Sequence, residues 1–405
     1  QSALDFNSIM DVSSPVNTAL LALNSRFFRL NHVAETITSP QLYAGPRQTP
    51  LHLKRFEHTI AAMDLKELSQ NLGLSQTTVS RALNGYPEVS ARTRQRVQDA
   101  ARAHNYTPST RAKGLATGKA LAIGHVIPVS SKHEMVNPIF GDFIAGAGEA
   151  YAKEGYEMVL SIVADADEEQ VYQGLKSRRA VDGVIVHGPR MDDPRIPFLH
   201  DIGLPFAVHG RASGCKLPYA WLDVNNRRSF ERATDFLFDL GHRRVALING
   251  LEDMDFAHRR REGYSASLLS HHCPIDPAIM RSGEMTEIFG YRSTLEMLEG
   301  PDAPTAVLCS SLISALGVRR AIEERGLVMG KDVSVVTHDD VLSYLQNGGD
   351  EPIFTATRSS VREAGRRLAQ MLLAMIADPL MPLPGELLEA ELMVGASTGP
   401  APRKD

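Results

Sequence analysis

The chain has 405 residues, a formal net charge of −5, 43% hydrophobic residues and 22% charged residues. This length exceeds a comfortable single domain, so we expect two or three folding units of an ordinary globular protein. Three widely spaced cysteines argue against a disulfide framework and favour a reducing cytoplasm. No apolar run approaches the length of about 20 residues that spans a bilayer, and no set of residues predicts a membrane partner, a metal site or a cofactor.

Residues 1–62 do not read as a domain. Their apolar patches are short and are interrupted by four prolines, and the stretch NTALLALNSRFFRLNH lacks the regions of a secretory signal. Met63 opens a segment of different character. We therefore expect residues 1–62 to be a non-native or disordered extension, which the mass of the protein purified from its own cell would test.

Residues 63–106 predict three short helices. Leu65, Leu68 and Leu72 fall on one helical stripe, Gly73 supplies a turn, and Ser75 stands where the N-cap of a second helix belongs. A third helix follows Ser90. Between Met63 and Lys119, nine basic minus four acidic residues leave a net charge of +5. A small basic module on an acidic body is typical of a protein that binds nucleic acid, with a solvated charged face as the alternative.

The second helix carries a polar face. Positions 77, 78 and 81 share that face and Gln76 lies beside them, whereas Val79 and Ala82 point inward. Short donors and acceptors near a helix start, with one arginine, suit contact with base edges and phosphates in the major groove. An ordinary exposed helix face is the alternative, but the flanking helix, the glycine turn and the serine caps favour DNA recognition.

Residues 121–400 alternate between apolar strands and amphipathic helices. Runs such as LAIGHVIPV, YEMVLSIV, VDGVIVHG, PFAVHG, RVALING, TAVLCS and DVSVVTH are separated by helical stretches such as FIAGAGEAYAKEG. Near-continuous apolar strands between helices predict parallel sheets covered on both faces. The stretch is too long for one open sheet, so we expect two α/β lobes. The polar tail STGPAPRKD, including residues 401–405 beyond the core, is expected to fray.

The segment LKELSQNLGLSQTTVSRALNGYPEVSARTRQRVQDAARAHNYTP resembles the headpiece of the LacI/GalR family of bacterial transcription regulators. The resemblance runs from Met63 to about Thr398 and implies a helix-turn-helix domain over residues 63–106, a hinge over residues 107–120 and a periplasmic-binding-protein-like core of two doubly wound lobes over residues 121–400. It implies that Gln76, Thr77 and Arg81 read bases. The residues it assigns to phosphates or to the headpiece itself are Thr78, Ser80, Asn84, Ser90 and Tyr106.

The hinge assignment rests on TPSTRAKGLATGKA. By the resemblance, two such segments lie side by side in the minor groove, and Leu115 is the intercalating wedge that kinks the duplex. A plain linker is the alternative, since Gly114 and Gly118 would suit it equally well.

The same resemblance implies an effector site between the carboxyl ends of the strands, where α/β sheets bind ligands. The residues that match are Asn137, Phe140, Arg260, Ser311 and Asp339. An arginine fork and a carboxylate suit sugar hydroxyls, and an aromatic ring suits an apolar sugar face. Three alternatives remain open: a solvated charge run over Arg259 to Arg261, Asp340 in place of Asp339, and Trp221 either as a core residue or as a ring that stacks on the ligand.

The resemblance implies a homodimeric repressor of carbohydrate genes that binds palindromic operator DNA under control of a sugar or sugar derivative, which either releases or strengthens the complex. The alternatives are a sugar kinase with a DNA-binding head and a sugar-binding protein without a regulatory role. No G-x-x-x-x-G-K-[ST] loop or G-x-S-x-G elbow appears, and the two glycines of GAGEA, Gly146 and Gly148, are expected to be packing features, so we predict no enzyme.

Overall fold

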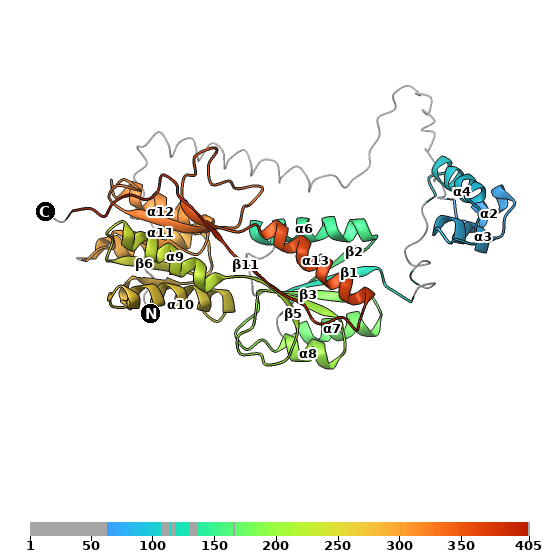
Figure 1. Cartoon of the computed structure of the whole chain (residues 1–405), viewed down its shortest axis with the longest axis horizontal. Helices are drawn as coiled ribbons and strands as arrows, with labels where there is room; N and C mark the ends of the chain where they lie inside the picture. The colour runs from blue at the N-terminus through green and yellow to red at the C-terminus, as the bar shows by residue number, and fades with distance from the viewer. Residues whose placement is uncertain are drawn as a thin grey trace, which may run out of the picture. The chain divides into compact units, whose positions relative to one another are not determined.

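The computed structural model describes residues 63–106, 114, 118–128, 137–164, 167–300 and 302–403 (Figure 1). The predicted extension over residues 1–62 and the predicted wedge Leu115 lie outside these described residues, as does most of the predicted hinge. None of the helices among the described residues combines the length and the apolar character that a membrane span requires.

The predicted three-helix headpiece is present. It consists of α2 (Leu65–Leu72), α3 (Gln76–Leu83) and α4 (Ala91–Ala103). Asp64 and Glu67 form a capping box at the start of α2, and Ser75 and Ser90 cap α3 and α4 as predicted. The helices close over one small apolar core, whose buried members are Leu68, Leu72, Val79, Ala82, Val89, Val97 and Ala101.

The first lobe is built on a six-stranded parallel sheet in the order β11-β5-β4-β3-β1-β2. Alternate residues of β3 enter two different apolar clusters, Ile185 on the side of α6 and α13 and Val184 on the side of α7 and α8, so both faces of the sheet are covered. The elements are β1 (Ala122–Pro128), α6 (Pro138–Glu154), β2 (Glu157–Val163), α7 (Glu168–Ser177), β3 (Gly183–His187), α8 (Arg195–Asp201), β4 (Phe206–His209), β5 (Ala220–Val224), α13 (Val361–Ala377) and β11 (Gly385–Leu388).

The second lobe repeats this plan with the strand order β12-β10-β9-β8-β6-β7, in which only β12 runs antiparallel to its neighbour. Helices α9 and α10 cover one face, and α11 and α12 the other. The elements are α9 (Asn226–Asp239), β6 (Val245–Asn249), α10 (Asp255–Ser270), the 3-10 helix η3 (Pro277–Ile279), β7 (Met280–Ser282), α11 (Glu287–Glu299), β8 (Ala306–Cys309), α12 (Leu312–Glu324), β9 (Ser334–Asp339), β10 (Thr355–Arg358) and β12 (Glu391–Met393).

The chain crosses between the lobes three times: between β5 and α9, between β10 and α13, and between β11 and β12. The carboxyl edges of the two sheets face each other, because the loop after β3 contacts the loop after β6. The amide of Asp255 donates to the carbonyl of Pro189 at 3.0 Å, and the amide of Ser213 donates to Asp255 Oδ1 at 2.8 Å. Ligands of parallel α/β sheets bind at such edges.

The prediction that the C-terminal tail frays from Ser397 onward is wrong for residues 397–401. The hydroxyl of Ser397 is buried and accepts a hydrogen bond from the amide of Thr355 at 2.8 Å, and the amide of Ala401 donates to the carbonyl of Leu240 at 2.9 Å. These polar residues are ordered because their side chains and amides complete hydrogen bonds at the margin of the second sheet.

Glycines allow the helix pairs on the lobes to pack closely. A Cβ at Gly146 of α6 would lie 1.9 Å from the carbonyl oxygen of Arg362, and a Cβ at Gly365 of α13 would lie 2.2 Å from that of Phe143. The interpretation of Gly146 as a packing residue is therefore confirmed. The same interpretation is wrong for Gly148, two residues further along α6, where a Cβ would have only Met158 Cε near it, at 3.9 Å.

The substitution Gly146→Ala is expected to lower the free energy of unfolding by about 1–3 kcal/mol, because a backbone carbonyl must move to admit the methyl group. Gly148→Ala in the same helix is the control and is expected to be neutral or stabilising by up to about 1 kcal/mol, since alanine favours helix. Urea denaturation of both variants checks this. Equal effects of the two substitutions would contradict the packing account.

Candidate functional site

The polar face predicted for the second helix of the headpiece is present. Gln76, Thr77 and Arg81 on α3 are exposed, whereas Val79 and Ala82 on the same helix are buried in the headpiece core. The Ser75 hydroxyl accepts from the amide of Thr78 at 3.1 Å and fixes the first turn of α3. Three polar side chains are therefore exposed on one side of a helix whose other side packs in the headpiece core and whose start is capped by Ser75.

The other residues predicted for DNA contact are engaged within the headpiece. Asn84 Nδ2 donates to the carbonyl of Ser80 at 2.9 Å, Ser90 accepts from the amide of Thr93 at 3.2 Å, and Tyr106 packs against the apolar core. Their positions suit the predicted role of holding the headpiece itself. Asn84 and Ser90 are nevertheless exposed, whereas Tyr106 is half-buried.

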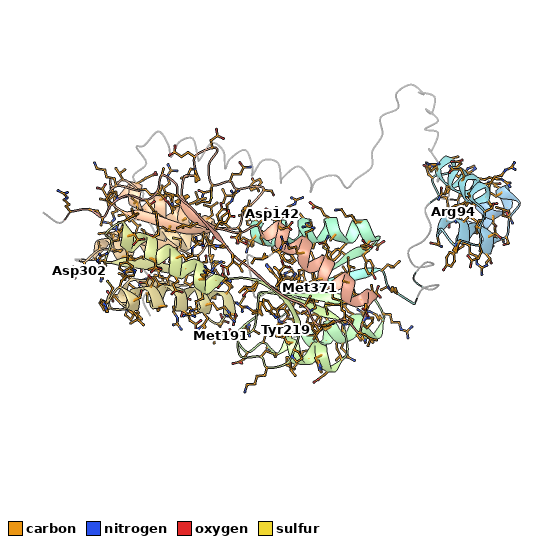
Figure 2. The ribbon with its side chains drawn as sticks, viewed as in Figure 1. Arg94, Asp142, Met191, Tyr219, Asp302 and Met371 are labelled. Carbon is orange, nitrogen blue, oxygen red and sulfur yellow. The ribbon has the colours of Figure 1, made fainter. Side chains whose placement is uncertain are left out.

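Two arginines of α4, which contribute to the positive charge of the headpiece, donate to backbone carbonyls. Arg94 Nη2 donates to the carbonyl of Tyr86 at 2.9 Å, and Arg96 Nη2 donates to that of Leu72 at 2.6 Å. Figure 2 shows Arg94 within the headpiece. These guanidinium groups tie α4 to the loop after α3 and to the end of α2, so their charge is partly committed to the fold.

Arg260 of α10, predicted for the effector site, is buried and held from several sides. Its Nε donates to Asn226 Oδ1 at 2.8 Å, and its Nη1 donates to the carbonyl of Ser310 at 2.5 Å. The guanidinium lies 5.0 Å from the ring centroids of both Phe230 and Phe256. Burial lowers the pKa of Arg260 to about 10, so the group stays charged. The alternative interpretation, a solvated charge run over Arg259 to Arg261, is therefore wrong for Arg260, which is buried.

The two carboxylates at the end of β9 have different surroundings. Asp339 Oδ1 accepts from the amide of Val341 at 2.8 Å and so supports a turn in which Val341 takes a φ of 56°. Asp340 lies in the electrostatic field of Arg260, and burial raises the pKa of Asp340 to about 7. A cavity of about 450 Å³ beside the loop after β9 is lined by Asp339 and Arg358, among others.

The predicted residues Asn137 and Ser311 both cap helices. Asn137 accepts from the amide of Ile139 at 3.1 Å at the start of α6, and the fully buried Ser311 accepts from the amide of Ile313 at 3.1 Å at the start of α12. Both therefore lie at the carboxyl edge of a sheet with their side-chain oxygens already in use.

Two histidines missed by the sequence analysis complete the edge of the first lobe. His187 ends β3 and His209 ends β4, and the two are paired in register with ring centroids 6.2 Å apart. Phe140, the predicted aromatic residue, is 8% exposed and meets His187 edge-on at 5.1 Å. The sequence contained a signal for these two histidines, because the predicted strands VIVHG and FAVHG both end in a histidine followed by glycine.

A hydrogen-bonded chain connects this lobe to Arg260. Arg211 Nε donates to Asp223 Oδ2 at 2.8 Å, and Asn226 Nδ2 donates to Asp223 Oδ1 at 3.2 Å, so Asn226 bonds to both Asp223 and Arg260. Asn226 follows the first crossover between the lobes. The guanidinium of Arg211 also lies 5.0 Å above the ring of Trp221, which packs against the apolar cluster of α7 and α8 as the core alternative predicted.

Comparison with known proteins decides the family. Residues 64–109 match the bacterial regulatory proteins of the lacI family, and residues 234–398 match the periplasmic binding protein-like domain. The HTH-type transcriptional regulator AglR of Rhizobium meliloti (strain 1021) is 45% identical over 340 residues, 84% of this chain and 95% of that protein. The chain belongs to the LacI family.

Other similarities agree with this assignment. The HTH-type transcriptional regulator RafR of Escherichia coli is 34% identical over 319 residues, 78% of this chain and 92% of that protein. A lac repressor dimer bound to operator and the anti-inducer ONPF is 26% identical with a TM-score of 0.71, and a CelR–cellobiose complex is 27% identical with a TM-score of 0.61; each alignment covers 83% of this chain and 99% of the other. The predicted fold class and the function of a DNA-binding transcriptional regulator are confirmed.

The substitution Arg94→Ala is expected to destabilise the headpiece by about 1–2 kcal/mol, because the carbonyl of Tyr86 loses a charged donor. Arg92→Ala is the matched control, since Arg92 on the same helix is exposed and forms no hydrogen bond with the described residues. Amide hydrogen exchange of residues 65–103 in the full chain measures the effect. Unchanged protection in the Arg94 variant would show that this arginine does not hold the headpiece.

Proposed function

We propose that this LacI-family regulator is a repressor of carbohydrate genes whose effector is a sugar bound between the carboxyl edges of the two lobes. The observation that carries the proposal is Arg260, a charged fork buried between Phe230 and Phe256 with Asp340 in its field. The guanidinium fork and the carboxylate suit the vicinal hydroxyls of a sugar, and the aromatic faces suit the apolar face of its ring. The CelR–cellobiose complex supports the choice of a sugar.

The proposed DNA-bound form is a homodimer on a palindromic operator in the cytoplasm. Gln76, Thr77 and Arg81 on α3 would enter the major groove, and the proposed hinge over residues 107–120 would place Leu115 in the minor groove. A two-fold dimer presents two such helices to two half-sites. The protein would act without chemical turnover, as its regulator relatives do.

Effector control would follow from the contacts that the lobes share. The chain from Arg260 through Asn226 to Asp223 crosses from one lobe to the other, so a sugar that binds Arg260 acts on groups at the first crossover. A sugar can shift the DNA-binding equilibrium only by its difference in affinity for the two lobe orientations. The proposed site includes Asn137, Phe140, Arg260, Ser311 and Asp339, with Asp340 as the carboxylate in the electrostatic field of Arg260.

The proposal is tested by titrating a panel of mono- and disaccharides, including cellobiose, maltose and sucrose, against the full chain. Trp221 is the only tryptophan and lies beside the hydrogen-bonded chain, so its fluorescence reports binding. At least one sugar is expected to bind, and Arg260→Met is expected to abolish that binding. Retained affinity in the variant would place the site elsewhere.

Base reading and phosphate contact are expected to separate by substitution. Replacing Gln76 or Thr77 by alanine should change which operator sequence is preferred, because these side chains would reach base edges. Arg81→Ala should also reduce the slope of log K against log salt by about 1 if the guanidinium contacts a phosphate. Fluorescence anisotropy on a set of operator variants measures both. Equal loss on every sequence for the Gln76 and Thr77 variants would mean that another face reads the DNA.

Sugar affinity is expected to depend on pH through Asp340. Its pKa is raised to about 7, and hydroxyl groups donate better to the ionised form, so affinity should rise by about tenfold from pH 6 to pH 8 and then level off. Asp340→Asn should remove this dependence. Asp339→Asn is the control, because the amide oxygen can still accept from Val341; it should keep the dependence but move its midpoint to lower pH, since the charge of Asp339 also raises the pKa of Asp340. A flat profile in the wild type would exclude Asp340 from the site.

A further inference from the structure

A chain of buried polar groups runs beneath the edge of the first lobe. The hydroxyl of Tyr151 on α6 lies 3.1 Å from His125 Nε2, and His125 Nδ1 lies 2.9 Å from His187 Nε2. Tyr151 and His125 are 1% and 0% exposed, whereas His187 at the end of β3 is partly exposed. The chain therefore starts in the core of the lobe and ends at the edge where the effector is proposed to bind.

The neighbouring rings hold His187 in one orientation. Phe140 and Phe143 on α6 meet the imidazole edge-on with ring centroids at 5.1 and 4.9 Å, and His125 stacks against it at 5.2 Å. A ring packed on these sides cannot exchange its two nitrogens without moving α6. Among the residues that the structure describes, Nδ1 of His187 has no hydrogen-bond partner.

All three imidazoles at this site are neutral. Burial lowers the pKa of His125 to about 3 and that of His209 to about 4, and it lowers the pKa of His187 well below its ordinary value. Each neutral ring carries one N–H donor and one acceptor nitrogen. The direction of the hydrogen bonds in this chain of polar groups therefore depends on which nitrogen of each ring carries the proton, and not on charge.

The hydroxyl of Tyr151 decides the direction of the chain. Within the described part of the structure, its hydrogen-bond partner is His125 Nε2, so the O–H has an acceptor only if that nitrogen is unprotonated. His125 then carries its proton on Nδ1 and donates to His187 Nε2, which leaves the proton of His187 on Nδ1. The opposite direction would bury the O–H of Tyr151 without an acceptor, which is costly.

We propose that Tyr151 and His125 fix the tautomer of His187, so that His187 Nδ1–H donates a hydrogen bond to an oxygen of the effector. This inference rests on the proposed effector function. It makes Tyr151 and His125 positioning residues and His187 a determinant of specificity. The effector must present an acceptor here, a hydroxyl, ring or carboxylate oxygen, and a ligand that presents an ammonium group at this point is rejected.

The tautomer can be measured without any ligand. In the full chain labelled with nitrogen-15 in its histidine rings, long-range proton–nitrogen spectra distinguish N–H from bare nitrogens, and His187→Gln identifies the signals. We expect His187 to carry its proton on Nδ1 in the wild type and to lose this preference in Tyr151→Phe. A proton on Nε2 of His187 in the wild type overturns the proposal.

The effect on the effector is measured by calorimetry with cellobiose, maltose and sucrose. Tyr151→Phe is expected to weaken the binding sugar about three- to tenfold while the thermal midpoint stays close to that of the wild type. Tyr172→Phe is the matched control, since Tyr172 is equally buried on the opposite face of the same sheet, and its affinity should not change.

The outcomes separate this inference from the function on which it rests. Unchanged sugar affinity in Tyr151→Phe, or equal losses in both tyrosine variants, overturns the role of the chain even when sugars bind. If no sugar of the panel binds the wild type, the proposed effector and the donation to it fail together, and the spectra still decide whether Tyr151 sets the tautomer.

Discussion

The buried guanidinium of Arg260 is the group on which the proposed effector site depends. A charge out of water is costly unless polar partners replace its hydration, and here Asn226 and the carbonyl of Ser310 do so, with Phe230 and Phe256 against its faces. Its lowered pKa of about 10 reflects the remaining cost of burial. A ligand oxygen at the open edge of the fork would be bound by a donor that is already oriented.

The same interaction links the site to the relative position of the lobes. Asn226 starts the first helix after the chain leaves the first lobe, and its amide bonds at once to Arg260 and to Asp223 at the end of β5. The amide of Ser213 and the carboxylate of Asp255 make a second link across the edges. Because these hydrogen bonds join the two lobes, a ligand that rearranges them changes how the lobes meet.

Sequence patterns predicted the headpiece well because its signals are local. Ser75 and Ser90 cap helices, and the stripe of Leu68 and Leu72 fills the core, as predicted. The long strands of both sheets were also recognisable as apolar runs. Strands β5 and β12 were missed, because the sequence AWLDV of β5 is interrupted by Asp223 and β12 has only three residues.

The site was only partly predictable, since its residues act through contacts between distant parts of the chain. Arg260 was identified by the resemblance to the LacI/GalR family. Nothing local shows that Arg94 and Arg96 serve the headpiece backbone, or that Ser397 returns to the second sheet. The decisive measurement is the operator affinity of the full chain on a site selected from random DNA, with and without the bound sugar. The account predicts a symmetric selected site and at least a fivefold change in affinity. Enrichment of no symmetric sequence, or equal affinity with and without the sugar, would contradict it.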